Sequence, residues 1–460
     1  PTGAIQIAPP TPTVEEPLPI PEPTYSPPPT LPYNFSYNTI ITVTTTDDPK
    51  AGNDWGDEIC YEAHPLNFYV PVAPCSLRRA VREAGALAQE RPEALPILIK
   101  FDLDTSDPNY SSDHGGYWTM VLSDTGDLNA LPSLGSETVL DGESPAAGRS
   151  DGPKIVVRGP EKVPAGYGLI LSGDDNLVRG LAFQRLRMHM FVGGSGNIIE
   201  RNWFGLSDDG LDLVLRDPDH PEDGTGQSGI IVAENGTRNL IQDNVLAGFR
   251  GGAVSFGSND SYFQGNYVGV NAEGEIPVDI TYNRVCKPNA RYYNWFGGAG
   301  VDVVGHRNVI GGPDAADGNI FASMLIRGQD PLATPPDALA IYGGDHLVQN
   351  NLIGVDALGQ DAGVCGNGLR LKADFTRFIS NTISQSGLYA LYQSGTRYNS
   401  NARTLQGNRV WDSETLLEFD PGIPEPFQIF TPSKITDITV AGGDTTVTGE
   451  NGEPSAPCPY

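Results

Sequence analysis

The stretch QNNLIGVDALG, residues 349–359, recurs twice earlier in the chain as ERNWFGLSDDG (200–210) and QGNYVGVNAEG (264–274). The phrase carries no catalytic signature, so it is either a repeated binding loop or a repeated structural corner. Its first half belongs to a wider set of short apolar runs broken by Asn and Gly, including NLIQDNVLAG, RFISNTIS and TLQGNRVW. Internal repetition of this kind indicates a repeat architecture.

The phrases align on the Asn that precedes the second short apolar run. This alignment gives one role to Asn202, Asn244, Asn266, Asn351, Asn381 and Asn408, with the segment 308–322 as a looser member. Successive asparagines are 42, 22, 85, 30 and 27 residues apart. A unit of roughly 20–30 residues with loop insertions explains all but the longest gaps, which we expect to hold further degenerate turns.

This pattern predicts an all-β chain folded as a parallel β-helix over residues 116–425. Each coil of such a solenoid hydrogen-bonds to the next at a spacing of about 4.8 Å, and short strands need two or three inward apolar residues. Corners need left-handed backbone, which Gly and Asn tolerate best, and a row of asparagines can pass amide hydrogen bonds between coils. We therefore expect Asn351 to turn the corner before the strand of Leu352 and Ile353. Gly354 is expected to allow close packing, and Asp356 and Gly359 to shape the loop.

The flanking segments have other compositions. Residues 1–32 are too Pro-rich for a helix or sheet and predict an extended tail or linker. Residues 33–115 predict a capping module with a strand at 37–46, an amphipathic helix at 76–90 capped by Ser76, and a strand at 95–103. The helix is expected to cover the open end of the β-helix. Residues 426–460 predict a β-hairpin that turns at Gly442 and Gly443.

Composition limits the partners. Lys plus Arg number 29 and Asp plus Glu 57, which gives a net charge of −28. Such a field disfavours nucleic acid, anionic membranes and, without a bridging cation, anionic polysaccharides. No run of the sequence is apolar enough for a membrane span.

Five cysteines suggest an oxidising compartment. Cys60 and Cys75 lie close in an otherwise Cys-poor chain and predict a local disulfide. Cys286 with Cys365 is a weaker second pair, and Cys458 is left over.

The run from TIITVTTTDDPKAGNDWGDEIC through APCSLRRAVREAGAL to LPILIKFDL resembles the N-terminal module of secreted bacterial right-handed parallel β-helix proteins of the CSLREA type. Cys75, Ser76, Leu77, Arg78 and Ala80 match that motif, and Arg79 stands where the family has Glu. With the phrases IGVDALG and VGVNAEG the resemblance covers most of residues 39–410. It implies a secreted or surface-displayed, elongated protein and no particular reaction.

A search for chemistry finds few candidates. Asp174 and Asp175 in SGDDN form the best acidic pair, but the companion motifs of a hydrolase are missing, so a corner turn is the stronger interpretation. Arg185, Arg187, Arg370 and Lys372 are the best basic candidates for a lyase. We name no catalytic residue. A Ca²⁺ site is the one cofactor expectation, in the acidic segment 207–224, through Asp208, Asp209, Asp217, Asp219 and Asp223.

Three functions remain. We expect an extracellular or cell-surface structural protein that self-associates into a filament, sheath or matrix through its two terminal extensions. The first alternative is a surface adhesin that binds a polysaccharide or cell-surface glycan. The second is a polysaccharide lyase or hydrolase.

Overall fold

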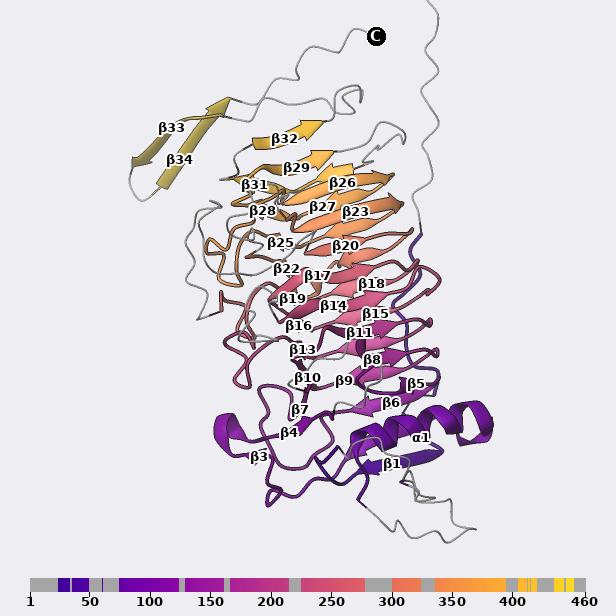
Figure 1. Cartoon of the computed structure of the whole chain (residues 1–460). Helices are drawn as coiled ribbons and strands as arrows, with labels where there is room; N and C mark the ends of the chain where they lie inside the picture. Colours follow the sequence, from indigo (N-terminus) through magenta and orange to yellow (C-terminus); the bar gives the residue numbers. More distant parts are fainter. Residues whose placement is uncertain are drawn as a thin grey trace, which may run out of the picture.

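The chain folds into a three-sided right-handed parallel β-helix (Figure 1), which confirms the predicted fold class. The computed structural model describes residues 24–33, 35–48, 60, 74–123, 129–160, 166–214, 225–277, 300–323, 336–393, 404–411, 413, 415–419, 434–441 and 444–450. Strands of this described part build two sheets of eleven strands, A and B, and one of ten strands, C. None of its helices is long and apolar enough to cross a membrane.

Sheet A consists of β1 (Thr39–Val43), β2 (Ile97–Phe101), β6 (Thr138–Asp141), β9 (Leu177–Arg179), β12 (Ile198–Glu200), β15 (Leu240–Gln242), β18 (Tyr262–Gln264), β21 (Val309–Gly311), β24 (Leu347–Gln349), β27 (Arg377–Ile379) and β30 (Thr404–Gln406). Sheet B consists of β3 (Tyr110–Ser111), β4 (Tyr117–Val121), β7 (Ile155–Arg158), β10 (Leu181–Gln184), β13 (Trp203–Phe204), β16 (Val245–Leu246), β19 (Tyr267–Val268), β22 (Ile320–Phe321), β25 (Leu352–Ile353), β28 (Thr382–Ser384) and β31 (Arg409–Trp411). Sheet C consists of β5 (Ser133–Leu134), β8 (Tyr167–Leu171), β11 (Met188–Val192), β14 (Gly226–Val232), β17 (Phe249–Phe256), β20 (Val301–Val303), β23 (Leu339–Gly344), β26 (Leu369–Asp374), β29 (Tyr389–Gln393) and β32 (Thr415–Phe419).

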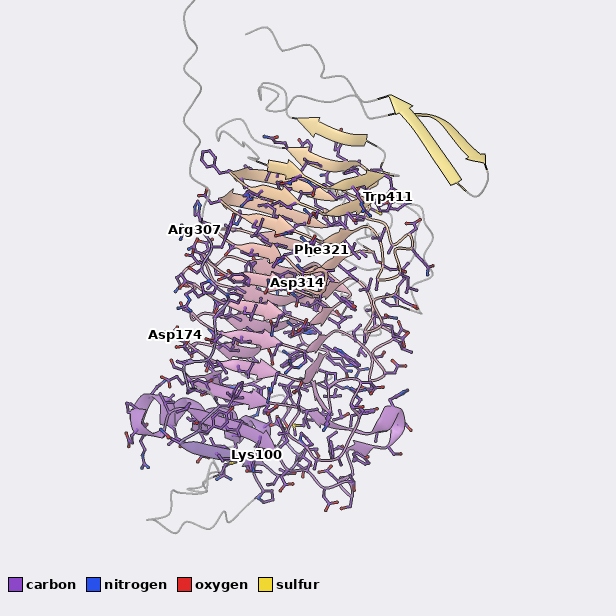
Figure 2. All side chains as sticks on the ribbon, turned by 180° about the vertical axis from the view of Figure 1, so that it is seen from behind. Lys100, Asp174, Arg307, Asp314, Phe321 and Trp411 are labelled. Carbon is purple, nitrogen blue, oxygen red and sulfur yellow. A yellow bond between two sulfur atoms is a disulfide. The ribbon has the colours of Figure 1, made fainter. Side chains whose placement is uncertain are left out.

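Each coil visits the three sheets in the order A, B, C, as β9, β10 and β11 show before β12 returns to sheet A. Neighbouring coils pair in parallel, so residues of one type stack along the axis. Inward positions form one continuous core, in which the rings of Phe183 and Phe204 stack at a centroid distance of 5.2 Å. Figure 2 shows Phe321 among the side chains of this stack.

The predicted asparagines form a ladder at the corner between sheets A and B, buried except at its end, where Asn408 is half-buried. Asn244 shows its chemistry: its Oδ1 accepts from the backbone N–H of Asn202 at 3.0 Å, and its Nδ2 donates to Oδ1 of Asn266 at 3.1 Å. Nδ2 of Asn244 also donates to the carbonyl of Ile199 at 2.9 Å. In the described chain the ladder runs through Asn202, Asn244, Asn266, Asn319, Asn351, Asn381 and Asn408. Asn319 comes from the segment that the sequence marked as a looser member.

The expectation that Asn351 itself turns the corner is wrong. The left-handed residue is Asn350, with φ 57°. The same offset holds for Arg201, Asp243, Gly265, Ser380 and Gly407, each immediately before a ladder asparagine. Because the ladder side chain must point into the interior along the axis, the backbone reverses one residue earlier.

A second ladder, which sequence reasoning missed, follows the corner between sheets C and A. Asn176, Asn197, Asn239, Ser261, Asn308 and His346 are all fully buried and each receives the backbone N–H of the residue one coil away. Its mixed composition hid it, since Ser and His replace Asn at two rungs. Asp174 and Arg307 lie on the edge of the β-helix beside this corner (Figure 2).

Helix α1 (Leu77–Glu90) covers the N-terminal end of the stack, as expected from its apolar face. Ser76 caps it by accepting the N–H of Arg79, and Arg78 is buried in an ion pair with Asp48 at 2.5 Å. The disulfide between Cys60 and Cys75 is present beside the start of the helix. Strands β1 and β2, placed by sequence in the capping module, are the first strands of sheet A.

Short 3₁₀ helices in the described part of the chain are η1 (Pro92–Ala94), η2 (Asp113–Gly115) and η4 (Ala315–Asp317). Near the C-terminus β33 (Lys434–Ala441) and β34 (Asp444–Glu450) form an antiparallel hairpin. Within the described chain these two strands pair with each other alone.

Replacing Asn244 by Ala should lower the free energy of unfolding by roughly 2–4 kcal/mol. The reason is that the backbone N–H of Asn202 and the carbonyl of Ile199 would then be buried without partners. Urea unfolding followed by circular dichroism measures the change. The control is Asn235→Ala at an exposed position; equal stability losses in the two variants would contradict the ladder's role.

His346→Asn should remove part of the protein's acid sensitivity. Burial lowers the pKa of His346 from 6.5 to about 4, so the neutral ring is favoured in the fold. Above pH 6.5 the lowered pKa has no effect on stability. Between pH 6.5 and 4 the His346 ring is protonated in the unfolded chain and stays neutral in the folded chain. The wild type should therefore lose up to about 3 kcal/mol more than the variant across that range. Chemical unfolding at pH 7.5 and 4.5 tests this, with exposed His306→Asn as the control.

Candidate functional site

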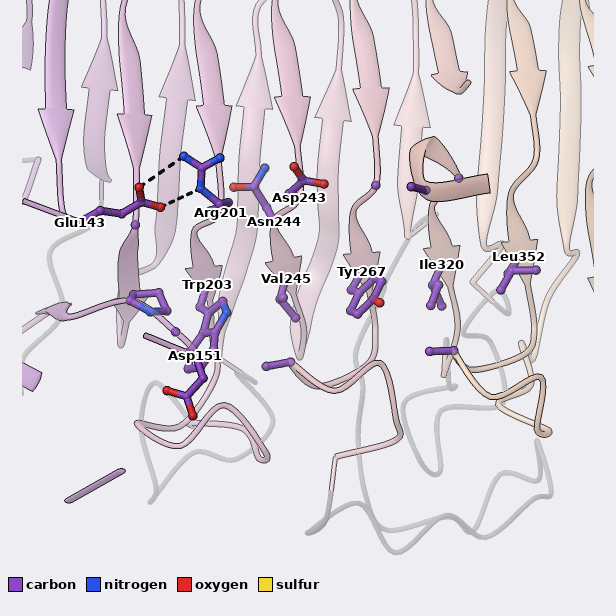
Figure 3. Close-up of a pocket in the computed structure, with 18 of the residues that line it drawn as sticks. Glu143, Asp151, Arg201, Trp203, Asp243, Asn244, Val245, Tyr267, Ile320 and Leu352 are labelled. Atoms are coloured by element: carbon purple, nitrogen blue, oxygen red, sulfur yellow. Dashed lines mark hydrogen bonds and ion pairs between the residues drawn. The ribbon is translucent and has the colours of Figure 1, made fainter. Parts of the chain in front are cut away.

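A groove of about 650 Å³ runs along the outer face of sheet B (Figure 3). Its floor is the row of outward side chains that the strand register stacks on five consecutive coils: Trp203, Val245, Tyr267, Ile320 and Leu352. Five coils span roughly 19 Å at the usual strand spacing. The groove is therefore long, narrow and apolar along its base.

Trp203 closes one end of the floor. Its ring lies against Gly152 and Gly210, where an added Cβ would come within 2.4 and 2.5 Å of Trp203 atoms. The guanidinium of Arg149 lies 4.9 Å from the ring centroid. Trp203 is only 8% exposed, whereas Tyr267 and Leu352 are half-buried. A ligand would thus touch Tyr267 and Leu352 more than Trp203.

One wall is the corner between sheets A and B. The left-handed residues that precede the ladder asparagines line the groove here, among them Arg201, Asp243 and Asn350. Arg201 is neutralised by Glu143, with Nε at 2.7 Å from Oε1, and by Glu200 at 2.6 Å. Burial raises the pKa of Asp243. The wall therefore presents paired charges and hydrogen-bonding groups and no uncompensated cation.

The opposite wall is built by the second half of the recurring phrase, QNNLIGVDALG at 349–359, and of its two earlier copies. Oδ1 of Asp356 accepts the N–H groups of Leu358 at 2.9 Å and Gln360 at 2.7 Å, which forms a tight turn. Asn271 organises the equivalent turn in the same way. Ala272 donates to the carbonyl of Gly210 at 2.9 Å, so the turns stack directly on one another.

The stack continues one turn further, because Ala357 donates to the carbonyl of Gly274 at 2.9 Å. Ala272 and Ala357 line the groove together with Asp151, Gly152 and Pro153. The phrase is thus a corner in its first half and a groove wall in its second. Gly354 between the halves has φ 77° and leaves no room for a Cβ, which would lie 1.8 Å from the carbonyl of Ser384.

The other residues singled out by sequence lie elsewhere. Asp174 and Asp175 occupy a turn at the corner between sheets C and A, where Oδ1 of Asp174 accepts the N–H of Ser195 at 2.7 Å and Asp175 has φ 56°. Neither residue lines the groove, and neither do Arg185, Arg187, Arg370 and Lys372.

The calcium expectation stays a prediction. Asp217, Asp219 and Asp223 lie outside the described residues. Asp208 is bound by protein groups, since its carboxylate accepts from Arg158 at 3.0 Å, Tyr117 at 3.0 Å and Gln184 at 2.8 Å. Asp209 accepts the N–H of Leu211 at 3.0 Å and shapes the turn. In the part of the chain described, no group of three metal-ligating side chains gathers.

Of the second cysteine pair, Cys365 is disulfide-bonded. Cys286 and Cys458 lie outside the described residues. The pairing of Cys286 with Cys365 therefore remains a prediction.

A second cluster of titratable side chains lies on sheet C. Asp337 forms an ion pair with Nε of Arg370 at 2.5 Å and accepts the side-chain amide of Asn367 at 2.6 Å. Burial, and then the charge of Asp337, raise the pKa of Asp302 to about 6. Arg370, a candidate base from the sequence, is therefore held in an ion pair.

No family model matches, and no curated protein matches the sequence. Solved structures that are similar include an alginate lyase from Paenibacillus sp. str. FPU-7, with 12% identity, 74% of this chain and 95% of that chain covered, and a TM-score of 0.41.

Two further similar structures have lower scores. One is the mannuronan C-5 epimerase AlgE4 A-module of Azotobacter vinelandii, with 14% identity, 75% and 94% covered, and a TM-score of 0.33. The other is the tailspike protein of E. coli bacteriophage HK620 in complex with pentasaccharide, with 12% identity, 75% and 60% covered, and a TM-score of 0.29. At these identities the likeness concerns the fold.

Asp302→Asn should stabilise the protein at neutral pH by up to about 3 kcal/mol. Because the folded pKa of Asp302 is raised from 3.8 to about 6, its ionised form carries a penalty above pH 6 that disappears as the pH falls below 4. Urea unfolding of both proteins at pH 7.5 and pH 4 measures this. Exposed Asp102→Asn is the control, and an equal advantage at both pH values would refute the assignment.

Proposed function

We propose that this protein is an extracellular β-helix rod that binds an uncharged polysaccharide or cell-surface glycan along the groove on sheet B. The observation that carries the proposal is the floor, a straight row of apolar and aromatic side chains on five coils between the polar wall at the corner of sheets A and B and the wall of stacked turns. Sugar rings offer apolar faces to such a floor and hydroxyl groups to the walls, and binding sites commonly combine these two features.

The charges at the groove and on the whole chain favour an uncharged glycan. Asp151 and Asp243 face the groove from opposite walls (Figure 3), and the Arg201 guanidinium is already paired with two carboxylates. The whole chain carries a net charge of −28. A polymer of uronates would meet like charge from the groove and from the protein, so a neutral chain is favoured.

A peptide is a poorer fit for the groove. The strands beneath the floor, from β13 to β25, each pair with a neighbour on both sides, so they offer no free edge for an added strand. Recognition must therefore come from side chains and from turns such as that of Asp356.

The extracellular location rests on the Cys60–Cys75 disulfide, which suits an oxidising compartment. The resemblance to the CSLREA-type module points the same way. Glycan binding was the first alternative from sequence, and the groove now favours it over the filament. Self-association stays a second proposal, and a contact on sheet A bears on it below.

Tyr267→Ala should weaken glycan binding at least about tenfold without unfolding the rod. The half-buried ring at the centre of the floor supplies apolar contact that Ala lacks. A glycan array followed by isothermal titration with the best neutral ligand measures the affinity. Tyr389→Ala, a half-buried tyrosine on sheet C, is the matched control.

Binding of uronate polymers in preference to neutral chains would overturn the proposal, and so would binding unaffected by Tyr267→Ala. Release of reducing ends or unsaturated uronates during the same titration would instead support the lyase or hydrolase alternative.

A further inference from the structure

The outer face of sheet A carries a row of apolar side chains where solvent-facing positions are normally polar. Strand register stacks them one per coil: Leu98, Val139, Leu177, Ile198, Leu240, Tyr262, Val309 and Leu347. The neighbouring outward row is polar, with Asp141, Arg179 and Glu200 joined in an ionic network. From Val139 to Val309 the apolar residues are at most 7% exposed, so something covers them.

The cover is the Pro-rich segment 24–33 of the same chain, followed by Tyr37. Tyr25, Leu31, Tyr33 and Tyr37 pack against the apolar row, and Pro29 is buried. Tyr262 donates its hydroxyl to the carbonyl of Ser26, and Tyr33 donates to the carbonyl of Asp175 at 3.1 Å. In Figure 1 the indigo trace runs along sheet A towards β1. The sequence predicted that this tail contacts a neighbouring subunit. Over these residues it lies instead on sheet A of its own chain.

This segment, which we call the strap, is held by side chains and not by strand pairing. Residues 24–31 form no helix or strand. Burial raises the pKa of Tyr33, in keeping with a ring pressed between strap and sheet. The strap can therefore leave and be replaced without breaking the hydrogen bonds of sheet A.

The turn between strap and β1 is strained. Phe35 has φ 59°, a left-handed conformation unfavourable for a bulky residue, and its side chain is 55% exposed. The N–H of Ser36 closes the turn on the carbonyl of Tyr33 at 2.9 Å. A short strained hinge beside an exchangeable element is the usual setting for domain swapping.

We propose that the apolar row on sheet A is a binding site for the strap of a second copy, so that two chains associate by exchanging residues 24–33. Opening the turn at Phe35 relieves its left-handed backbone, and each sheet A is again covered by an identical strap. The two copies thus keep the contacts of Tyr33 and Tyr262 while gaining an intermolecular link. The inference does not rest on glycan binding, since the groove lies on sheet B.

A pair of substitutions at one exposed position tests the exchange. Proline cannot adopt φ 59°, so Phe35→Pro should open the turn and raise the dimer fraction roughly tenfold over wild type. Glycine adopts that φ without strain, so Phe35→Gly should lower the dimer fraction by a similar factor. Size-exclusion chromatography with light scattering at matched concentrations reads the mass, and circular dichroism confirms that each variant is folded.

Leu240→Arg on the row of the full chain should abolish the dimer formed by Phe35→Pro. Mixed copies carrying donor and acceptor dyes on residues 24–33 and sheet A should show energy transfer if straps exchange. A folded, monomeric Phe35→Pro variant overturns the proposal. So does a dimer whose amount is the same in all three proteins. If Phe35→Pro fails to fold, an unchanged dimer fraction in Phe35→Gly decides against it.

Discussion

At the corners between sheets A and B and between sheets C and A, strand pairing stops, yet the backbone N–H groups there face a dry interior and need acceptors. The two side-chain ladders meet that need. An asparagine offers an oxygen to one coil and an N–H₂ group to another, so a single residue type continues the hydrogen-bond network where the sheet is interrupted. Coil spacing, register and the straight rows on every face depend on this substitution of side chain for backbone.

The ladder also determines what the surface can do. Because Asn244 turns into the core, the reversal falls on Asp243, which then stands at the rim of the groove. The same offset places Arg201 and Asn350 along that rim. The wall of the candidate site is therefore a by-product of the corner geometry, while the floor follows from the strand register. A change in the sequence at the rim can alter recognition without disturbing the buried asparagine beside it.

Sequence reasoning reached the features that a spacing or a local pattern marks. The row of asparagines, helix α1 and the local disulfide follow from spacing, amphipathicity and cysteine proximity, and all three are present, although the chain turns one residue before the asparagines. The second ladder was missed because His346 and Ser261 replace Asn there, so no single letter recurs. The groove was missed because Trp203, Tyr267 and Leu352 are far apart in sequence and look like core residues until the register shows which face they share. The strap was missed because a Pro-rich segment has no pattern that names the surface it will contact.

The stacked turns have a repeat distance along the axis that differs from the spacing of the strands. Floor residues such as Val245 and Tyr267 recur on every coil, but the turns at Gly210, Ala272 and Ala357 belong to β13, β19 and β25, which are every second strand of sheet B. The wall thus repeats at roughly 9.6 Å, twice the strand spacing. A glycan bound as proposed would lie beside these turns at Trp203, Tyr267 and Leu352, so they would contact the polymer at twice the strand spacing.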